Sequence, residues 1–365
     1  MIESMTRRTF IKGTAAAAVL AGPLRGLAAV EKPQTINLAF IGCAHIHTSQ
    51  FISILQTRAD VKVKYAWDHS AARAQKYAKD LNAKVVTNLD EIWGDPAIAG
   101  VVITSETNCH LELVLAAVKA QKHLFVEKPL GTNVADAAAM ADAIEKAGLL
   151  FNTGYDNRSM PHHWFIKEQI AKGTFGKISR AYASRCHNAA LEGWFDGDFR
   201  WMADPKIAGF GALGDLGTHP LDLLMWLLGD VEAVTADVKS VTGRYGDCDE
   251  TGEALVRFKN GAIGTVAASY VALKDPVTLM ISGTEAHAMM YDNHLFFVCP
   301  KIGGADGRKM WTKLPRPLSH PLLLWADAVA GTRDIPLVKP REAAERVRVM
   351  EAIYRAAREK KWITV

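Results

Sequence analysis

The chain has 365 residues, of which 49% are hydrophobic and 22% charged, and its formal net charge is +4. This length suits two domains of average size, and the composition is that of a soluble globular protein, which excludes a largely disordered chain. Residues 1–28 carry +3 of the charge, so the remainder is close to neutral and lacks the basic stripe of a nucleic-acid-binding protein.

The N-terminus has the pattern of an export signal. The pair Arg7 and Arg8 precedes a run of small and apolar residues, 13–22, which is too short to span a bilayer. Small residues around Ala28 provide a cleavage site. We therefore predict a twin-arginine signal over residues 1–29, a periplasmic location and no stable membrane insertion. The alternative is an ordinary basic tail.

The next segment, residues 33–153, alternates short apolar runs with helical periodicity. The predicted strands are Ile36–Ile41, Val61–Trp67, Val85–Thr87, Gly100–Thr104 and His123–Val126. The predicted helices are Thr48–Gln56, Ala71–Leu81, Leu111–Ala120 and Val134–Ala147. This series of β-α units predicts an α/β fold with a doubly wound parallel sheet, which binds ligands beyond the carboxyl ends of its strands.

Residues 154–365 have a different character. A predicted helix at His162–Lys172 is followed by strands without intervening helices, and Asn260-Gly261 is a hairpin signal. These strands are Lys177–Cys186, Ala233–Thr242, Glu253–Phe258, Ala262–Tyr270 and Val277–Ser282. The pattern predicts an α+β domain with a mostly antiparallel open sheet. Two closing helices, Leu318–Gly331 and Arg341–Lys360, are candidates for packing back on the first domain.

The first predicted strand ends in a reduced dinucleotide fingerprint. Gly42 permits the tight turn, Ala44 leaves room for a pyrophosphate, and His47 replaces the last glycine of the motif. Asp68 ends the second predicted strand, where a carboxylate can accept hydrogen bonds from a ribose hydroxyl and repels a 2′-phosphate. This favours NAD over NADP. The alternative for Asp68 is an acidic helix cap.

His45 and His47 form a pair within this loop. Alternate residues entering a helix point in different directions, and no carboxylate is near in sequence, so we predict no metal site. The remaining interpretations are an imidazole beside the cofactor or substrate, or a structural role. The five cysteines are an odd number with no paired spacing, and we interpret them mostly as buried small hydrophobic residues.

Two motifs identify a family. Glu127-Lys128-Pro129 follows a predicted strand, and Asp215, His219 and Asp222 occur in the pattern D-x-G-x-H-x-x-D at the start of an apolar helix. With these motifs the chain resembles the glucose-fructose oxidoreductase / inositol dehydrogenase / MocA family.

The resemblance extends through Ser105–His110, Gly154–Arg158, Gly283–Glu285 and Lys360–Trp362. The departures are the missing fingerprint glycines and Glu106, where proline is common.

The resemblance implies a set of site residues. Family dehydrogenases use a Lys, an Asp and a His, which here are Lys128, Asp215 and His219. His219 is the expected general base, because an unperturbed imidazole titrates near neutral pH. Lys128 is expected to stabilise charge on the reacting oxygen, and Asp215 to hold the other two groups in register. The implied cofactor contacts are Gly42, Ala44, His45, Asp68, Thr104, Ser105, His110, Glu127, Lys128 and Asn157.

Other residues of these motifs have expected supporting roles. Asp222 is expected to be structural, and Pro129 to direct Lys128 into the cleft, for example through a cis peptide bond. An aromatic loop provides candidate substrate contacts at Trp194 and Trp201, and the alternative for this loop is packing or an oligomer contact. Further candidate contacts are Arg158 and His187.

An exported enzyme has no external pool of nicotinamide cofactor and must retain its own. The expected function is therefore an NAD(P)-dependent oxidoreductase that acts on a sugar or polyol hydroxyl and recycles a tightly bound cofactor. One alternative is a glycosidase that works by transient oxidation, elimination and re-reduction, and the other is a non-catalytic sugar-binding protein. By analogy with the family, we expect a small-molecule carbohydrate substrate and a homo-oligomer, either a dimer or a tetramer.

Overall fold

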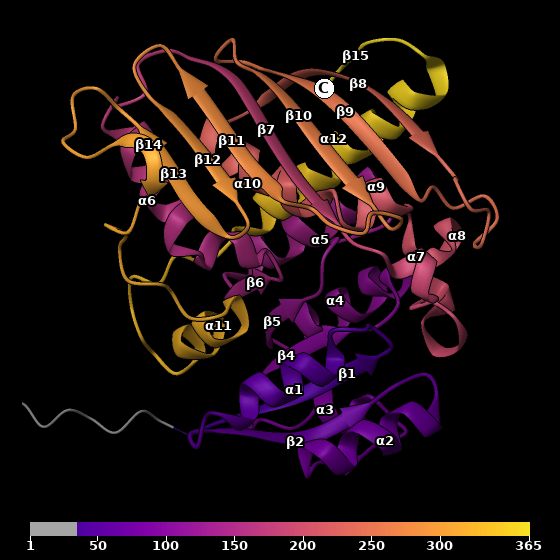
Figure 1. Ribbon diagram of the computed structural model, residues 1–365. Helices are drawn as coiled ribbons and strands as arrows, with labels where there is room; N and C mark the ends of the chain where they lie inside the picture. The colour runs from indigo at the N-terminus through magenta and orange to yellow at the C-terminus, as the bar shows by residue number, and fades with distance from the viewer. Residues whose placement is uncertain (1–34) are drawn as a thin grey trace, which may run out of the picture. The chain divides into compact units, whose positions relative to one another are not determined.

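Six parallel strands form the first sheet of the computed structural model, which describes residues 35–365 (Figure 1). The signal predicted over residues 1–29 lies outside the described residues. The strand order is β3-β2-β1-β4-β5-β6, so the order reverses between β1 and β4. The strands are β1 (Ile36–Cys43), β2 (Val61–Trp67), β3 (Lys84–Val85), β4 (Ile98–Thr104), β5 (His123–Val126) and β6 (Phe151–Thr153). This is the doubly wound sheet that the sequence predicts.

Helices cover both faces of this sheet because its central strands are apolar on both sides. In β1, Leu38 and Phe40 pack in one buried cluster, whereas Ala39 and Ile41 pack in the other. Asn133 caps the last helix of this region by accepting a hydrogen bond from Asp136 N. The helices are α1 (Thr48–Gln56), α2 (Ala71–Leu81), α3 (Asp90–Trp93), η1 (Thr107–Cys109), α4 (His110–Lys119) and α5 (Val134–Ala147).

The second sheet has nine strands in the order β14-β13-β12-β11-β7-β10-β9-β8-β15. Only β7 and β10 pair in parallel among these strands of residues 35–365, which confirms a mostly antiparallel sheet. The strands are β7 (Ile178–Cys186), β8 (Val231–Lys239), β9 (Thr251–Phe258), β10 (Ile263–Ser269), β11 (Val277–Gly283), β12 (His287–Tyr291), β13 (His294–Val298), β14 (Asp306–Met310) and β15 (Ile363–Thr364).

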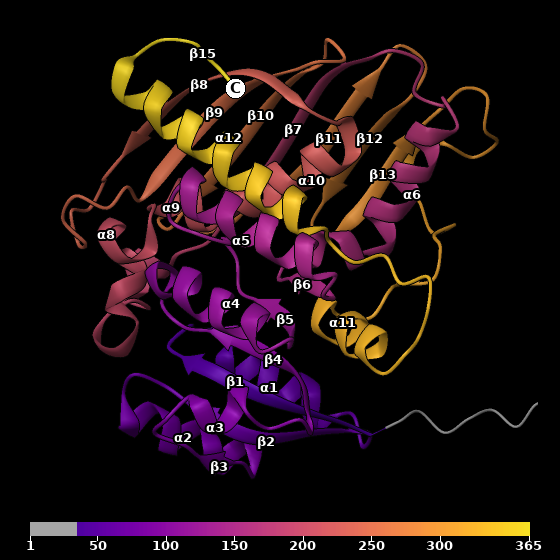
Figure 2. The ribbon, with the colours of Figure 1, turned by 180° about the vertical axis from the view of Figure 1, so that it is seen from behind.

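One face of the nine-stranded sheet is covered by helices, as Figure 2 shows from behind. Buried and exposed residues alternate along β9, as expected for a strand with one solvated face. The remaining helices are η2 (Asp156–Ser159), α6 (Pro161–Ala171), α7 (Ala189–Glu192), η3 (Gly197–Ala203), α8 (Pro205–Ala208), α9 (Ala212–Asp215), α10 (Thr218–Leu228), α11 (Pro321–Val329) and α12 (Pro340–Glu359). Among the described residues, none of the helices has the length and apolar character that a membrane crossing needs.

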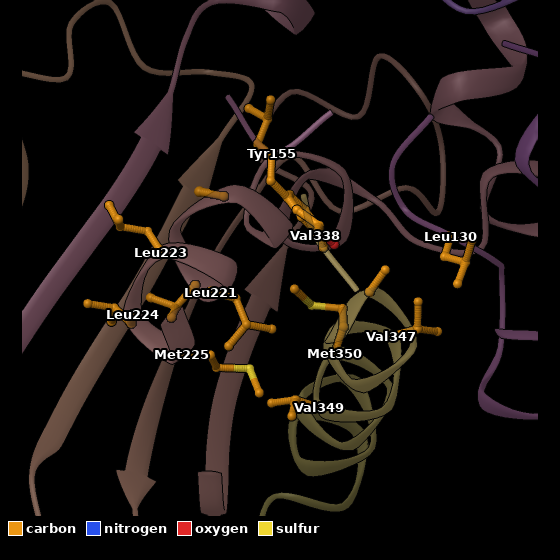
Figure 3. Packing of buried hydrophobic residues seen from close by; sticks show 14 of the residues in the cluster. Leu130, Tyr155, Leu221, Leu223, Leu224, Met225, Val338, Val347, Val349 and Met350 are labelled. Atoms are coloured by element: carbon orange, nitrogen blue, oxygen red, sulfur yellow. The ribbon is translucent and has the colours of Figure 1, made fainter. Parts of the chain in front are cut away.

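The two sheets belong to one compact unit, and α12 connects them by contacting both α5 and β8. Between α12 and α10 the side chains of Leu221, Met225, Val349 and Met350 form a continuous apolar layer (Figure 3). Helix α11 packs against α1 and β6 of the first sheet. Helix α10, which carries part of the candidate site, also contacts η2, the segment that follows β6.

Candidate active site

Lys128 joins the two halves of the structure. It follows β5, and its Nζ atom lies 2.7 Å from Asp215 Oδ1 and 3.2 Å from the Asp215 carbonyl oxygen at the end of α9. Both side chains are almost inaccessible to solvent. The Lys128–Pro129 peptide bond is cis. The first two residues of the predicted triad therefore form a buried ion pair.

Asp215 has a second partner that the sequence analysis missed. The Tyr270 hydroxyl donates a hydrogen bond to Asp215 Oδ2 at 2.6 Å. Burial alone would raise the pKa of Asp215, but Lys128 and these hydrogen bonds hold it below its usual range. Burial and the adjacent carboxylate raise the pKa of Tyr270 well above its usual value. Asp215 is therefore ionised, and Tyr270 remains a hydrogen-bond donor.

His219 lies in the first turn of α10, facing Asp156. Its Nδ1 atom is 3.3 Å from Asp156 Oδ1 but makes no well-oriented hydrogen bond within residues 35–365. Asp156 also accepts a hydrogen bond of 2.8 Å from Arg185. Burial, with smaller effects of Arg185 and Lys128, lowers the pKa of His219 to about 4. The expectation of an unperturbed imidazole was therefore wrong, because the ring is desolvated and neutral at pH 7.

The predicted triad converges on one cavity. This cavity has a volume of about 300 Å³, which is the lower end of the range for small-ligand sites. It is lined by Ile46, His47, Lys128, Arg185, His187, Trp194, Phe195, Met202, Asp215, Leu216 and His219. The rings of His187 and Trp194 stack with a centroid distance of 4.8 Å. The cavity thus combines an aromatic wall with charged and hydrogen-bonding groups, as a carbohydrate site requires.

Two of the predicted substrate contacts are placed elsewhere. Trp201 does not line this cavity, because its Nε1 donates a hydrogen bond to the Ala44 carbonyl at 3.2 Å. The expectation that Trp201 contacts the substrate is therefore wrong, and its side chain supports the fingerprint loop. The Arg158 guanidinium is bound to both carboxylate oxygens of Asp222, at 2.6 and 2.9 Å. Arg158 is therefore corrected to a structural residue, and Asp222 has the structural contacts that were expected.

The fingerprint loop is held tightly on the end of β4. Gly42 has a φ of +74°, and a Cβ atom there would approach Ser105 Cβ to 2.4 Å, so only glycine fits. The Thr104 hydroxyl donates to the Gly42 carbonyl at 2.6 Å, and the Thr104 carbonyl accepts hydrogen bonds from Ala44 N and His45 N. The loop therefore has the close backbone packing that a dinucleotide site requires at the strand-order reversal.

Asp68 is fixed beside this loop. Its carboxylate accepts hydrogen bonds of 2.6 Å from Cys43 N and Ser70 N and one of 3.0 Å from Arg73 Nε. Arg73 also contacts Glu106 at 2.6 Å. Helix α2 is capped by Ser70, so Asp68 is not its N-cap. Asp68 thus lies at the end of β2, at the position predicted to contact the ribose. Its carboxylate is bound to the Arg73 guanidinium.

A carboxylate lies beside the histidine pair, although none is near the pair in the sequence. His47 Nδ1 is 2.7 Å from Glu127 Oε1, and His45 Nδ1 is 3.6 Å from the same oxygen. The possible ligand atoms of these three residues lie within 4.8 Å of one another. Burial lowers the pKa of His45 to about 3. The chain reaches this arrangement because the carboxyl ends of parallel strands β1 and β5 meet at one edge of the sheet.

The other predicted cofactor residues lie at the same edge of the sheet. His110 begins α4, and its Nδ1 atom is 3.1 Å from the Leu130 carbonyl. Its Nε2 atom is buried without a hydrogen-bond partner among residues 35–365. Asn157 makes a long contact of 3.5 Å to the His219 carbonyl. The cradle at Gly42 and the polar groups around it fit a dinucleotide.

Comparison with known proteins agrees with this arrangement. A family model described as "Oxidoreductase family, NAD-binding Rossmann fold" matches residues 36–155. A second model, "GFO/IDH/MocA C-terminal domain", matches residues 163–289. Together the two models cover both sheets, except for the C-terminal strands and helices.

Curated relatives include a myo-inositol 2-dehydrogenase of Thermotoga maritima, with 31% identity over 63% of this chain and 66% of the relative. A levoglucosan dehydrogenase of Pseudarthrobacter phenanthrenivorans is 30% identical over 53% of this chain and 55% of the relative. The matched region thus spans slightly more than half to about two thirds of these two relatives.

Solved structures show the same fold along nearly the whole chain. A levoglucosan dehydrogenase in complex with NADH and levoglucosan has a TM-score of 0.77 at 22% identity, covering 91% of this chain and 100% of that one. An aldose-aldose oxidoreductase from Caulobacter crescentus has a TM-score of 0.77 at 20% identity, with the same coverage.

Proposed function

The chain belongs to the GFO/IDH/MocA family of oxidoreductases with an NAD-binding Rossmann fold, and on this premise we propose that it oxidises a hydroxyl group of a sugar or sugar-like polyol. The observation that carries this proposal is the convergence of Lys128, Asp215 and His219 on one cavity beside the fingerprint loop. The two curated relatives, named for a polyol and an anhydrosugar, support the substrate class.

The residues that would hold the dinucleotide are Gly42, Ala44, Thr104 and Ser105 at the carboxyl ends of β1 and β4, with Asp68 at the ribose position. When bound, NAD supplies the acceptor for the hydride that leaves the substrate carbon. The protein's own side chains must then accept one hydroxyl proton and stabilise the negative charge on one oxygen.

Lys128 provides the hydrogen bond to that oxygen. A lysine ammonium has three N–H donors, of which two are directed to Asp215 Oδ1 and the Asp215 carbonyl. The third has no hydrogen-bond partner among residues 35–365 and can donate to a substrate hydroxyl in the cavity. As the hydroxyl loses its proton, the positive charge on Lys128 stabilises the developing alkoxide in a site from which water is largely excluded.

His219 is the proton acceptor in this proposal. Its neutral ring can take the hydroxyl proton, and Asp156, 3.3 Å from Nδ1, would stabilise the imidazolium that forms. Asp215 has a positioning role, because Lys128 and Tyr270 occupy its two oxygens. Each of the three predicted residues therefore has a separate task.

The experiment that tests the function uses the purified protein without added cofactor. The protein is denatured to identify any nucleotide that it releases, and the native protein is mixed with myo-inositol, levoglucosan and aldoses while the absorbance of reduced nicotinamide is followed. We expect retained NAD that is reduced by at least one of these compounds. Binding of sugars without any nucleotide or reduction would instead favour a sugar-binding protein.

Asp68 is proposed to select NAD over NADP. Its carboxylate would repel a 2′-phosphate, and it also holds the Arg73 guanidinium, at 2.9 Å. Asp68→Ser is expected to weaken NAD binding and to strengthen NADP binding, because the repelling carboxylate is removed and Arg73, which keeps its contact with Glu106, remains beside the phosphate position. Titration of nucleotide-free protein with both nucleotides measures the ratio, and Asp80→Ser on the surface of α2 is the control. Tighter NADP binding by the wild type would contradict the assignment.

We further propose export by the twin-arginine pathway, which is supported by Arg7 and Arg8 in the sequence. Replacing both by Lys is expected to retain the precursor in the cytoplasm. An unchanged periplasmic yield in cell fractionation would refute this.

A homo-oligomer, either a dimer or a tetramer, is proposed through the uncovered face of the nine-stranded sheet. Leu255 and Ile263 on neighbouring strands β9 and β10 are 39% and 48% exposed. Sedimentation velocity tests this proposal, and a monomer at micromolar concentration would contradict it.

A further inference from the structure

Asp215 depends on a very short helix for its position. It is the last residue of α9, and both its carbonyl oxygen and its Oδ1 atom bind Lys128 Nζ. A helix of four residues is not stable alone, and the first amide groups of a helix lack partners within it. The N-cap residue is Gly211, which has no side chain to supply one. The groups that fix α9 must therefore come from other elements.

A tyrosine on α12 binds two of these amide groups. The Tyr354 hydroxyl accepts hydrogen bonds from Gly211 N at 3.1 Å and from Gly214 N at 3.0 Å. Its aromatic ring packs against Phe210, with a centroid distance of 5.2 Å. Helix α12 passes beside α9 in both views of the molecule (Figures 1 and 2). One phenol therefore holds the start of α9 at two points.

Asp249, which precedes β9, binds the two amide groups that lie between them. Its carbonyl oxygen accepts a hydrogen bond of 2.9 Å from Ala212 N, and its Oδ2 atom accepts one of 2.9 Å from Leu213 N. Its Oδ1 atom accepts one of 2.8 Å from the Tyr354 hydroxyl. A Cβ atom at Gly211 would lie 2.1 Å from Asp249 Oδ1, so only glycine allows this close approach.

The donors and acceptors of this network fit one another. A phenol has one O–H donor and two acceptor sites. Amide groups occupy both acceptor sites of Tyr354, so its proton is directed to Asp249. Burial and the adjacent carboxylate raise the pKa of Tyr354 well above its usual value, so this donor keeps its proton. Replacing either side chain would leave amide groups of α9 without their acceptors.

The network is connected to the catalytic lysine through the backbone. Asp215 N donates a hydrogen bond of 2.8 Å to the carbonyl of Gly211, the residue whose amide Tyr354 binds. Asp215 in turn directs the Lys128 ammonium through its two contacts, at 2.7 and 3.2 Å. A shift at the start of α9 would therefore move the Lys128 donor relative to the substrate.

We propose that Tyr354 and Asp249 are positioning residues of the reaction, which fix the backbone of α9 so that Asp215 aims the Lys128 ammonium at the reacting oxygen. Neither residue lines the 300 Å³ cavity, so neither contacts the substrate. They act through Lys128, because a small displacement of a catalytic group removes much of its contribution to the rate. The inference rests on the proposed function, which assigns that task to Lys128.

The test measures single-turnover reduction of the retained nucleotide by myo-inositol, levoglucosan and aldoses. Tyr354→Phe removes the hydroxyl and keeps the ring against Phe210. Its maximal rate is expected to fall by about tenfold to a hundredfold. The sugar concentration that gives half of that rate should change by less than about twofold, because substrate binding is largely retained.

The matched control is Tyr65→Phe. The Tyr65 hydroxyl also donates to a carboxylate, Asp95 Oδ2 at 3.0 Å, and Tyr65 does not line the cavity. This variant is expected to keep the wild-type rate. Asp249→Asn is an independent test of the same network, because asparagine offers one acceptor oxygen in place of two. It should lower the maximal rate as Tyr354→Phe does.

A double variant separates positioning from a general loosening of the fold. Because Tyr354 acts through Lys128, the variant with both Lys128→Met and Tyr354→Phe should reduce the nucleotide at the rate of Lys128→Met alone. A purely structural role of Tyr354 would lower the rate of the double variant further.

Three results would overturn the inference. The first is a wild-type rate in Tyr354→Phe, which leaves the proposed function intact. The second is a further loss of rate in the double variant. The third is the absence of nucleotide reduction in the wild type, which removes the proposed function as well.

Discussion

Lys128→Met is expected to lower turnover by about a hundredfold to ten-thousandfold while the protein still retains its nucleotide. The reason is that Lys128 Nζ is the donor aimed at the reacting oxygen, whereas the fingerprint loop is held by hydrogen bonds between β1 and β4. Single-turnover reduction of the bound nucleotide measures the chemical step directly. Methionine preserves the apolar stem of the side chain, so packing around β5 is kept.

The matched control for this variant is Lys122→Met. Lys122 is also buried, lies just before β5 and donates a hydrogen bond of 2.7 Å to the Asp95 carbonyl, far from the cavity. It is expected to lose some stability but to keep its rate. Equal rates for Lys128→Met and the wild type would remove Lys128 from the mechanism.

Asp222→Ala is expected to destabilise the fold by about 3–5 kcal/mol. Asp222 is fully buried and binds two guanidinium groups, Arg158 at 2.6 Å and Arg346 at 2.8 Å. Removing the carboxylate leaves two buried cations that share one remaining carboxylate, Glu342 at 3.3 Å from Arg158, which is the costly way to break an ion pair. The free energy of unfolding from urea titration gives the effect.

The control is Asp230→Ala, which removes the exposed ion pair with Lys259. Such a pair contributes less than about 1 kcal/mol, so the two variants should differ several-fold. A similar loss in both would show that the Asp222 network does not hold α10 and α12 together.

The same network gives a pH dependence. Burial by itself would raise the pKa of Asp222, but Arg158 and Arg346 lower it below that of an aspartate in the unfolded chain. Its contribution to stability is therefore present above the unfolded pKa of about 4 and is lost as the pH falls through the folded value. Urea titrations from about pH 5 down to below pH 4 should show a smaller decline in Asp222→Ala than in the wild type.

Most of the fold could be predicted because local patterning determines it. The predicted helix Thr48–Gln56 and strand Val61–Trp67 have the bounds of α1 and β2. Strands β12 to β14 were missed because they are short and no helical segment separates them, and because β14 is largely polar. Their signal was the pair Asp292-Asn293, which has positive φ at both residues and forms the tight turn between β12 and β13.

The candidate site was only partly predictable, for a different reason. Lys128, Asp215 and His219 occur in motifs that local sequence reveals. Their partners do not, because the Tyr270–Asp215 and His47–Glu127 contacts join residues 55 and 80 positions apart. The pairing of β10 with β7 and the order of the parallel strands determine which distant residues come into contact. The same distance in sequence explains why a carboxylate for the histidine pair went unnoticed.

The parallel pairing of β7 with β10 has a consequence for how the enzyme matures. The segment between these strands contains Asp215, His219 and two further strands, so the chain must close a long loop before the pair can form. Non-local pairing of this kind slows folding. Helix α12, which is translated after both of these strands, then closes over α5. A ribosome-bound chain would therefore complete its first sheet, with the fingerprint loop, well before the catalytic groups meet.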